Sequence, residues 1–136
     1  MIIIRNILAV LVGIGVGGVA NLQILKYGAL IIPPPEGLIS GDMESLKEFM
    51  PMFGPEQFVT PFLAHAIGTL VGAWLAAMIA ASHQMKLALG IGIWFFAMGI
   101  IMSFMLPAPL WFTAVDSLFA YIPMGWLGWK LAGSKS

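Results

Sequence analysis

The chain has 136 residues, of which 60% are hydrophobic and only 9% are charged, and its formal net charge is zero. Its mean hydropathy of +0.99 lies far above that of soluble domains. This composition excludes an ordinary soluble globular protein, and the lack of a basic patch excludes nucleic-acid binding. Because it has no cysteine, the chain cannot use a disulfide, a thiolate nucleophile or a Cys-ligated metal.

Four stretches are apolar enough to cross a hydrocarbon core of about 30 Å, which takes roughly 20 residues as an α-helix. They leave one sizeable segment outside the membrane, residues 26–60, and no room for a separate soluble domain. We therefore predict an all-α fold in which residues 1–136 form a single integral membrane domain, a four-helix bundle. The predicted spans are residues 2–25, 61–81, 87–106 and 109–131.

The first predicted span begins with Arg5 ahead of an apolar run, an arrangement that is also typical of a cleaved signal peptide. The apolar run continues to Leu25, past the small residues 18–20 where such a peptide would be cut. This continuation favours a retained membrane span.

The long segment 26–60 alternates rigid turns with a short amphipathic stretch. The proline run 33–35 predicts an extended rod, and Asp42 is a suitable N-cap for a helical turn or two that Pro51 stops. We expect this stretch to lie on the membrane surface or to cap the mouth of the bundle, while a loop that binds a partner is the alternative. The apolar side would carry Met50, Met52 and Phe53.

Small residues recur at four-residue spacing in the first two spans, which lets helix backbones approach closely inside a membrane. The stripes could join helices within one chain or between copies, and a homo-oligomer built on them is one prediction. The glycines concerned are Gly13 and Gly17 in the first span and Gly68 and Gly72 in the second.

Basic residues are retained on the cytoplasmic side of a membrane more often than they are exported. With four spans, both chain ends and the turn at 82–86 share one side, which carries more basic residues than the acidic opposite side. We therefore predict a multi-pass plasma-membrane protein in contact with lipids, with both termini cytoplasmic and the segment 26–60 external.

Polar side chains gather at one depth of the predicted spans. At about 1.5 Å per residue, His65 lies roughly 6 Å inside the start of its span, and Asp116 roughly 10 Å inside the start of its own. The spans thus place polar groups in the outer third of the membrane, while the inner half has few besides Tyr121. The candidates at this level are His65, Asp116, Asn21, Thr69, Ser103 and Thr113.

Asp116 is the one carboxylate inside a predicted span, and ionisable groups within a membrane are costly enough to be functional candidates. Together with His65 it could hold a proton, orient a bound polar group or, with Glu36 folding in from the loop, bind a metal. The alternative is that these polar side chains only tie helices together by hydrogen bonds. We predict no cofactor and no resident metal ion.

Motifs of soluble enzymes are absent, since the sequence has no His-Glu-x-x-His helix, Walker loop or Gly-x-Ser-x-Gly elbow. The stretches "IIPPPEG", "PFLAHAIGTLVGA", "LPAPLWF" and "AYIPMGW" together resemble a family of small, uncharacterised four-span bacterial membrane proteins. The resemblance covers nearly the whole chain and implies a bacterial inner-membrane location, with interest falling on Glu36, His65 and Asp116. It implies no activity.

Three functions remain open from the sequence. The favoured one is a non-enzymatic oligomeric scaffold or accessory protein whose outer-leaflet polar pocket binds a lipid headgroup or a small ligand. The second is an oligomeric proton-linked transporter or channel that uses His65 and Asp116, but no predicted span has the marked break near its middle that many transporters have. The third is a membrane enzyme with the same pair as acid and base.

Overall fold

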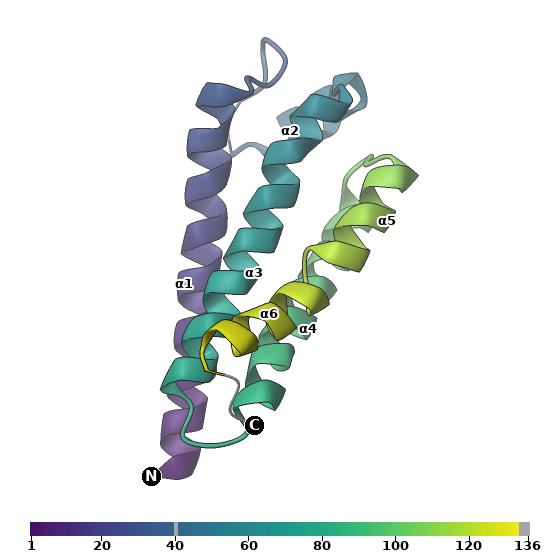
Figure 1. The fold of residues 1–136 in the computed structure, drawn as a ribbon. Helices are drawn as coiled ribbons and strands as arrows, with labels where there is room; N and C mark the ends of the chain where they lie inside the picture. The colour runs from purple at the N-terminus through teal and green to yellow at the C-terminus, as the bar shows by residue number, and fades with distance from the viewer. Residues whose placement is uncertain (40, 134–136) are drawn as a thin grey trace.

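The computed structural model describes residues 1–39 and 41–133, and every regular element within them is helical (Figure 1). Three helices are long and apolar enough to cross a membrane: α1 (Ile2–Ile31), α3 (Val59–Ile79) and α4 (Gln84–Met105). Most of their large apolar side chains face outward, as lipid contact requires. The prediction of an all-α protein with membrane-spanning helices is confirmed to this extent.

The connection between the first two long helices is shorter than predicted. Helix α1 continues past Leu25 to Ile31, because nothing in the sequence stops it before the proline run 33–35. Helix α3 begins at Val59, directly after the 3₁₀ helix η2 (Pro55–Phe58). The connecting segment is therefore residues 32–58 rather than 26–60.

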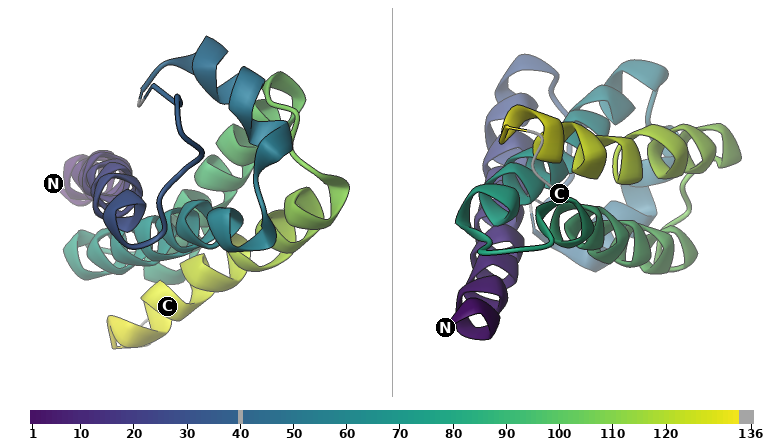
Figure 2. Two further views of the ribbon diagram at one scale, coloured as in Figure 1. Left: turned by 90° about the horizontal axis from the view of Figure 1, so that it is seen from above. Right: turned by 60° about the horizontal axis from the view of Figure 1, so that its bottom comes forward.

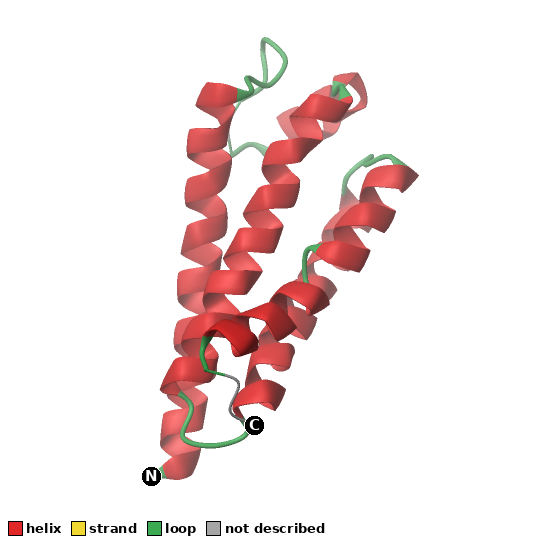
Figure 3. Cartoon of the chain, in the orientation of Figure 1, coloured by secondary structure: helices red, strands yellow, loops and turns green. Residues whose placement is uncertain are grey.

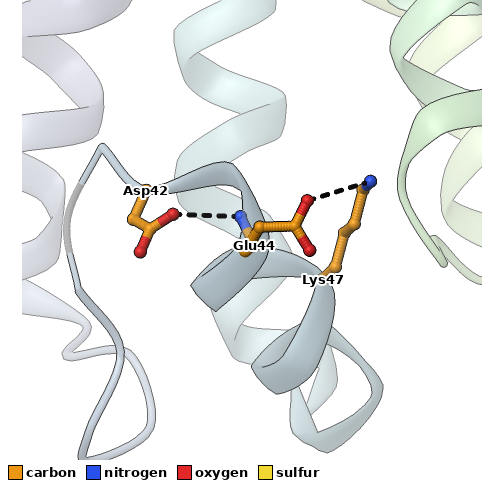
Figure 4. A network of polar contacts seen from close by, with 3 residues as sticks. All are labelled: Asp42, Glu44 and Lys47. Atoms are coloured by element: carbon orange, nitrogen blue, oxygen red, sulfur yellow. Dashed lines mark hydrogen bonds and ion pairs between the residues drawn. The ribbon is translucent and has the colours of Figure 1, made fainter.

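Within this connection, Asp42 caps the short helix α2 (Met43–Phe49), as the sequence predicts. Its carboxylate accepts a hydrogen bond of 3.1 Å from the main-chain N–H of Glu44, and the Glu44 carboxylate lies 3.5 Å from the Lys47 ammonium (Figure 4). The 3₁₀ helix η1 (Met50–Met52), which contains Pro51, follows and ends the helical run.

The connection caps the bundle at the end away from the N terminus. Met50 and Phe58 are buried against Phe112 of the fourth apolar segment, and Phe53 packs around them. This supports the predicted cap, with one correction: Met52 is 64% exposed and does not belong to the apolar side.

Helices α1 and α3 run antiparallel in direct backbone contact. A Cβ added at Gly72 would lie 2.5 Å from the carbonyl oxygen of Gly13, and one added at Gly17 would lie 2.7 Å from that of Gly68. The glycine stripes thus pack against each other within one chain, as small residues do between membrane helices. The homo-oligomer expected from the same stripes stays a prediction.

The N-terminal end of α1 holds the turn between α3 and α4. The Asn6 amide oxygen accepts hydrogen bonds from the main-chain N–H groups of Ala81 and Ser82, and its Nδ2 donates to the Ser82 hydroxyl. The Arg5 guanidinium donates to the carbonyl of Ile79. Figure 1 shows this turn at the same end of the molecule as the N terminus, as expected if both lie on one side of the membrane.

The fourth apolar segment is not one helix, which corrects the predicted unbroken span 109–131. It consists of α5 (Leu110–Phe119) and α6 (Ile122–Leu131), ten residues each, joined at a bend that is visible in Figure 3. Each piece is only about 15 Å long, half a membrane core. Pro123 explains the break, because proline in a continuous helix would lack an N–H for the carbonyl of Phe119 and clash with it.

Helix α6 lies across α3 and α4 and packs closely on both (Figure 2). A Cβ at Gly128 would lie 2.9 Å from the Leu70 carbonyl oxygen of α3, and one at Gly125 would lie 3.0 Å from that of Ala88 in α4. Helix α5, by contrast, meets its neighbours mainly through the cap and the polar cluster described next.

Candidate functional site

His65 lies on the face of α3 that looks toward α5. Its neighbours Ala64 and Ala66 are buried, while 29% of its own side chain is exposed. Its ring Nδ1 lies 2.8 Å from Oδ1 of Asp116. The structure therefore brings together the two ionisable residues that the sequence places at a similar depth.

Asp116 lies near the carboxyl end of α5 and is buried, with only 6% of the residue exposed. Both of its carboxylate oxygens have partners: Oδ1 meets His65, and Oδ2 accepts a 2.8 Å hydrogen bond from the hydroxyl of Tyr121. Burial of an acidic group is tolerated when its oxygens are hydrogen-bonded in this way. The cluster formed by His65, Asp116 and Tyr121 is called the polar cluster below.

Tyr121 reaches Asp116 only because the helix breaks between α5 and α6. Five residues along an unbroken helix correspond to a rotation of about 140°, which would turn the two side chains to different faces. At the bend, the Tyr121 ring instead lies over His65, with ring centroids 5.7 Å apart and an interplanar angle of 25°. The straight helix expected from the sequence places Tyr121 in the other half of the membrane, away from Asp116, although Pro123 is the signal for the break that brings them together.

The surroundings of Tyr121 fix its position. It is 3% exposed, packs with Ala66 and Ala120, and meets the edge of the Phe96 ring of α4. Gly99 of α4 leaves room for its hydroxyl, since a Cβ there would overlap it. Three helical segments besides α6 therefore hold the phenol against the carboxylate.

The hydrogen-bond pattern assigns the roles within the polar cluster. The phenol of Tyr121 donates to Oδ2 of Asp116, and the tautomer of His65 that carries its proton on Nδ1 donates to Oδ1. The second ring nitrogen, Nε2, then points away from Asp116 and has no hydrogen-bond partner among the described residues. A carboxylate that orients a histidine in this way leaves its far nitrogen ready to bind a proton or a polar group.

The remaining candidates do not join the polar cluster through any hydrogen bond. The Ser103 hydroxyl donates to the carbonyl of Ile100 in its own helix, and Thr113 is half-buried on α5. Within residues 1–39 and 41–133, the hydroxyl of Thr69, which is 1% exposed, has no hydrogen-bond partner, and the buried side-chain oxygen of Asn21 has none either.

Glu36 is exposed in the connecting segment and does not fold in toward His65, as the metal-site hypothesis required. In residues 1–39 and 41–133, no three His, Asp or Glu side chains gather closely enough to hold a metal ion. His83, in the turn between α3 and α4, is exposed, and its Nδ1 lies 3.0 Å from the Ser82 hydroxyl.

Two cavities lie at the capped end of the bundle. One, of about 240 Å³, lies between Phe58 and Trp111 and is lined by prolines, aromatic rings and Met50. The other, of about 520 Å³, lies against α2. Neither includes His65 or Asp116, so the polar cluster meets its surroundings through the exposed edge of His65.

These features define a small helical protein with three candidate membrane-spanning helices, an interrupted fourth segment and a histidine–aspartate–tyrosine cluster. No family model, no curated protein and no solved structure matches the chain. The resemblance to four-span bacterial membrane proteins stays a prediction.

Proposed function

We propose that the chain is a non-enzymatic protein of the bacterial inner membrane that binds a lipid headgroup or a small polar ligand through Nε2 of His65. One observation carries the proposal: Nδ1 of His65 is engaged by Asp116, while 29% of the side chain is exposed and Nε2 is left without a partner in the described chain. If the segment 32–58 is external, as the distribution of basic residues favours, this nitrogen lies in the outer leaflet.

The arrangement suits binding better than helix pairing alone. A histidine that only joined α3 to α5 would need one hydrogen bond, and a serine or an asparagine could supply it at lower cost. Here Asp116 and the ring of Tyr121 hold the imidazole in one orientation. Such fixed orientation lowers the entropy that a binding group loses when a ligand arrives.

The experiment is native mass spectrometry of the full chain, extracted gently from its own membrane. We expect a bound small mass in constant ratio to the protein, lost in His65→Ala and kept in the matched control His83→Ala, which alters the exposed histidine of the turn. Identical bound masses in all three proteins would refute the proposal. The same spectra report whether the protein is an oligomer.

A second candidate, a proton-linked carrier, is favoured by the interruption between α5 and α6. The unbroken spans expected from the sequence counted against transport, and the interruption removes that objection. A second objection stands, because the polar residues do not continue to the cytoplasmic face, as a complete pathway would require. Interrupted helices at the middle of a membrane are where many transporters bind their ions.

Carrier activity would be measured as proton-driven flux into proteoliposomes. The wild-type protein should move protons faster than empty vesicles do, and Asp116→Asn, which removes the charge and keeps the shape, should abolish the excess. Flux equal to that of empty vesicles, or unchanged in Asp116→Asn, would exclude this candidate. An enzymatic role, the third possibility, has no further observation in its favour.

A further inference from the structure

The tautomer of His65 decides what kind of ligand Nε2 can bind. Nδ1 lies 2.8 Å from Oδ1 of Asp116, and Oδ2 of the same carboxyl group accepts from the hydroxyl of Tyr121. In the tautomer that donates from Nδ1, the other nitrogen, Nε2, has a lone pair and carries no hydrogen. A ligand at this nitrogen must therefore donate a hydrogen bond to it.

The surroundings of His65 disfavour a charged ligand of either sign. Within residues 1–39 and 41–133, Asp116 has no lysine or arginine as an ion-pair partner, so its carboxylate repels an anion. An ammonium group would have to leave water for a helix that is apolar enough to cross a membrane, which is costly. It would also approach the positive amino end of α6, because Tyr121 is the N-cap residue of that helix. A neutral donor avoids these costs.

The packing around His65 offers a ligand a single polar contact. Nδ1 is engaged by Asp116, and the ring of Tyr121 lies against the imidazole, with the ring centroids 5.7 Å apart. The aromatic rings of Phe62 and Phe96 pack around Tyr121, and neither cavity at the capped end includes His65. Beyond Nε2, the ligand therefore meets apolar side chains or lipid.

We propose that the group bound at Nε2 of His65 is the hydroxyl of a neutral, mainly apolar molecule, which is either a lipid alcohol such as a diglyceride or a membrane-soluble phenol. The inference rests on the proposed function and narrows its ligand to one chemical class. A hydroxyl donates to the lone pair without carrying a charge, and the hydrogen bond offsets the cost of taking its polar group out of water.

The test uses probes with one alkyl chain and different head groups: decanol, decyl methyl ether, decanoate and decylammonium, with a para-alkyl phenol as the aromatic hydroxyl. Each is titrated into the full chain, labelled with ¹⁵N-histidine, in lipid nanodiscs. The His65 Nε2 resonance should shift saturably with decanol or the phenol. The ether, which has no donor, should bind about tenfold more weakly, as the loss of about 1.4 kcal/mol implies. The ionic probes should bind no better than the ether.

His83 is the internal control, because it is exposed in the turn between α3 and α4 and its resonances should not move with any probe. Whichever of decanol and the phenol binds more tightly identifies the source of the hydroxyl. Tightest binding of decanoate or decylammonium, or equal shifts with all probes, would overturn the inference.

Native mass spectra separate this inference from the proposed function on which it rests. A retained molecule that carries a hydroxyl, is uncharged and is lost in His65→Ala would support both. A retained molecule that His65→Ala loses but that has no hydroxyl would overturn the inference and leave the proposed function standing. Masses that are identical in the wild type and His65→Ala would refute the proposed function, and the probe titration would still decide whether Nε2 selects a hydroxyl.

Discussion

Helix α3 contacts α1 and α5 through two different kinds of interaction. Toward α1 the contact consists of four glycines whose backbones touch, and toward α5 it consists of the buried carboxylate of Asp116 with a donor on each oxygen. Glycine contacts are short-range and numerous, so they fix a separation and tolerate no added atom. The polar cluster has few, directional contacts, so it fixes an orientation. The glycine contacts fix the position of α3, and the polar cluster fixes the orientation of the His65 side chain.

One of the two largest effects is expected from adding a single methyl group to the glycine face. Gly72→Ala would bring its Cβ to 2.5 Å from the Gly13 carbonyl oxygen, and neither backbone can yield without separating the helices. We expect it to lower the free energy of unfolding by about 1–3 kcal/mol. Reversible denaturation in mixed micelles measures the change.

Gly15→Ala is the matched control for this substitution. It adds the same methyl group to α1 at a position where the new Cβ would have no atom within 4 Å apart from its chain neighbours and its own helix backbone. Because alanine favours helices over glycine, it should stabilise slightly, by about 0.5–1 kcal/mol. Equal destabilisation by Gly72→Ala and Gly15→Ala would contradict the packing described for α1 and α3.

On the polar face, Asp116→Ala should destabilise by about 1–3 kcal/mol, because it leaves the buried hydroxyl of Tyr121 and the Nδ1–H of His65 without acceptors. Asp116→Asn should cost less, since an amide can accept from His65 and donate to the phenol oxygen. Thermal melts of both variants in the same detergent give the comparison. If asparagine were as damaging as alanine, the charge rather than the hydrogen bonds would hold α5.

Tyr121→Phe removes one hydrogen bond and keeps the ring, so its expected cost is about 1 kcal/mol. Tyr27→Phe on α1 is the control, because Tyr27 is 56% exposed and should tolerate the change. Melting temperatures of the two single variants check the difference. No difference between them would mean that the Tyr121 hydroxyl does not stabilise the bend.

Much of the fold follows from the sequence because its signals are local. Length and apolar composition predict α1, α3 and α4, and the four-residue spacing of Gly13, Gly17, Gly68 and Gly72 predicts a close helix contact. The Asp42 cap is equally local, since the carboxylate bonds an N–H only two residues away. Whether the glycines meet within one chain depends on which helices pair, and residue spacing alone does not predict that.

The candidate site was predictable only in part. The helical rise of about 1.5 Å per residue predicts that His65 and Asp116 lie at a similar depth. The same estimate assumes a straight helix and therefore places Tyr121 too far from Asp116. Pro123 stands in the middle of an apolar stretch, where composition predicts a span and backbone chemistry predicts a break. Ser103 and Thr113 show that depth does not fix a hydrogen-bond partner: the Ser103 hydroxyl donates to the carbonyl of Ile100 in its own helix, and Thr113, one turn before Asp116 on the same face of α5, makes no hydrogen bond to the polar cluster.

The measurement that tests the account most directly is the ¹⁵N NMR spectrum of histidine-labelled protein in lipid, recorded with His83→Gln so that His65 gives the only imidazole signals. The account predicts a proton on Nδ1 at neutral pH, with a resonance that shifts when Asp116→Ala is added. A proton on Nε2 alone, together with His65 resonances that Asp116→Ala leaves unchanged, would contradict the account.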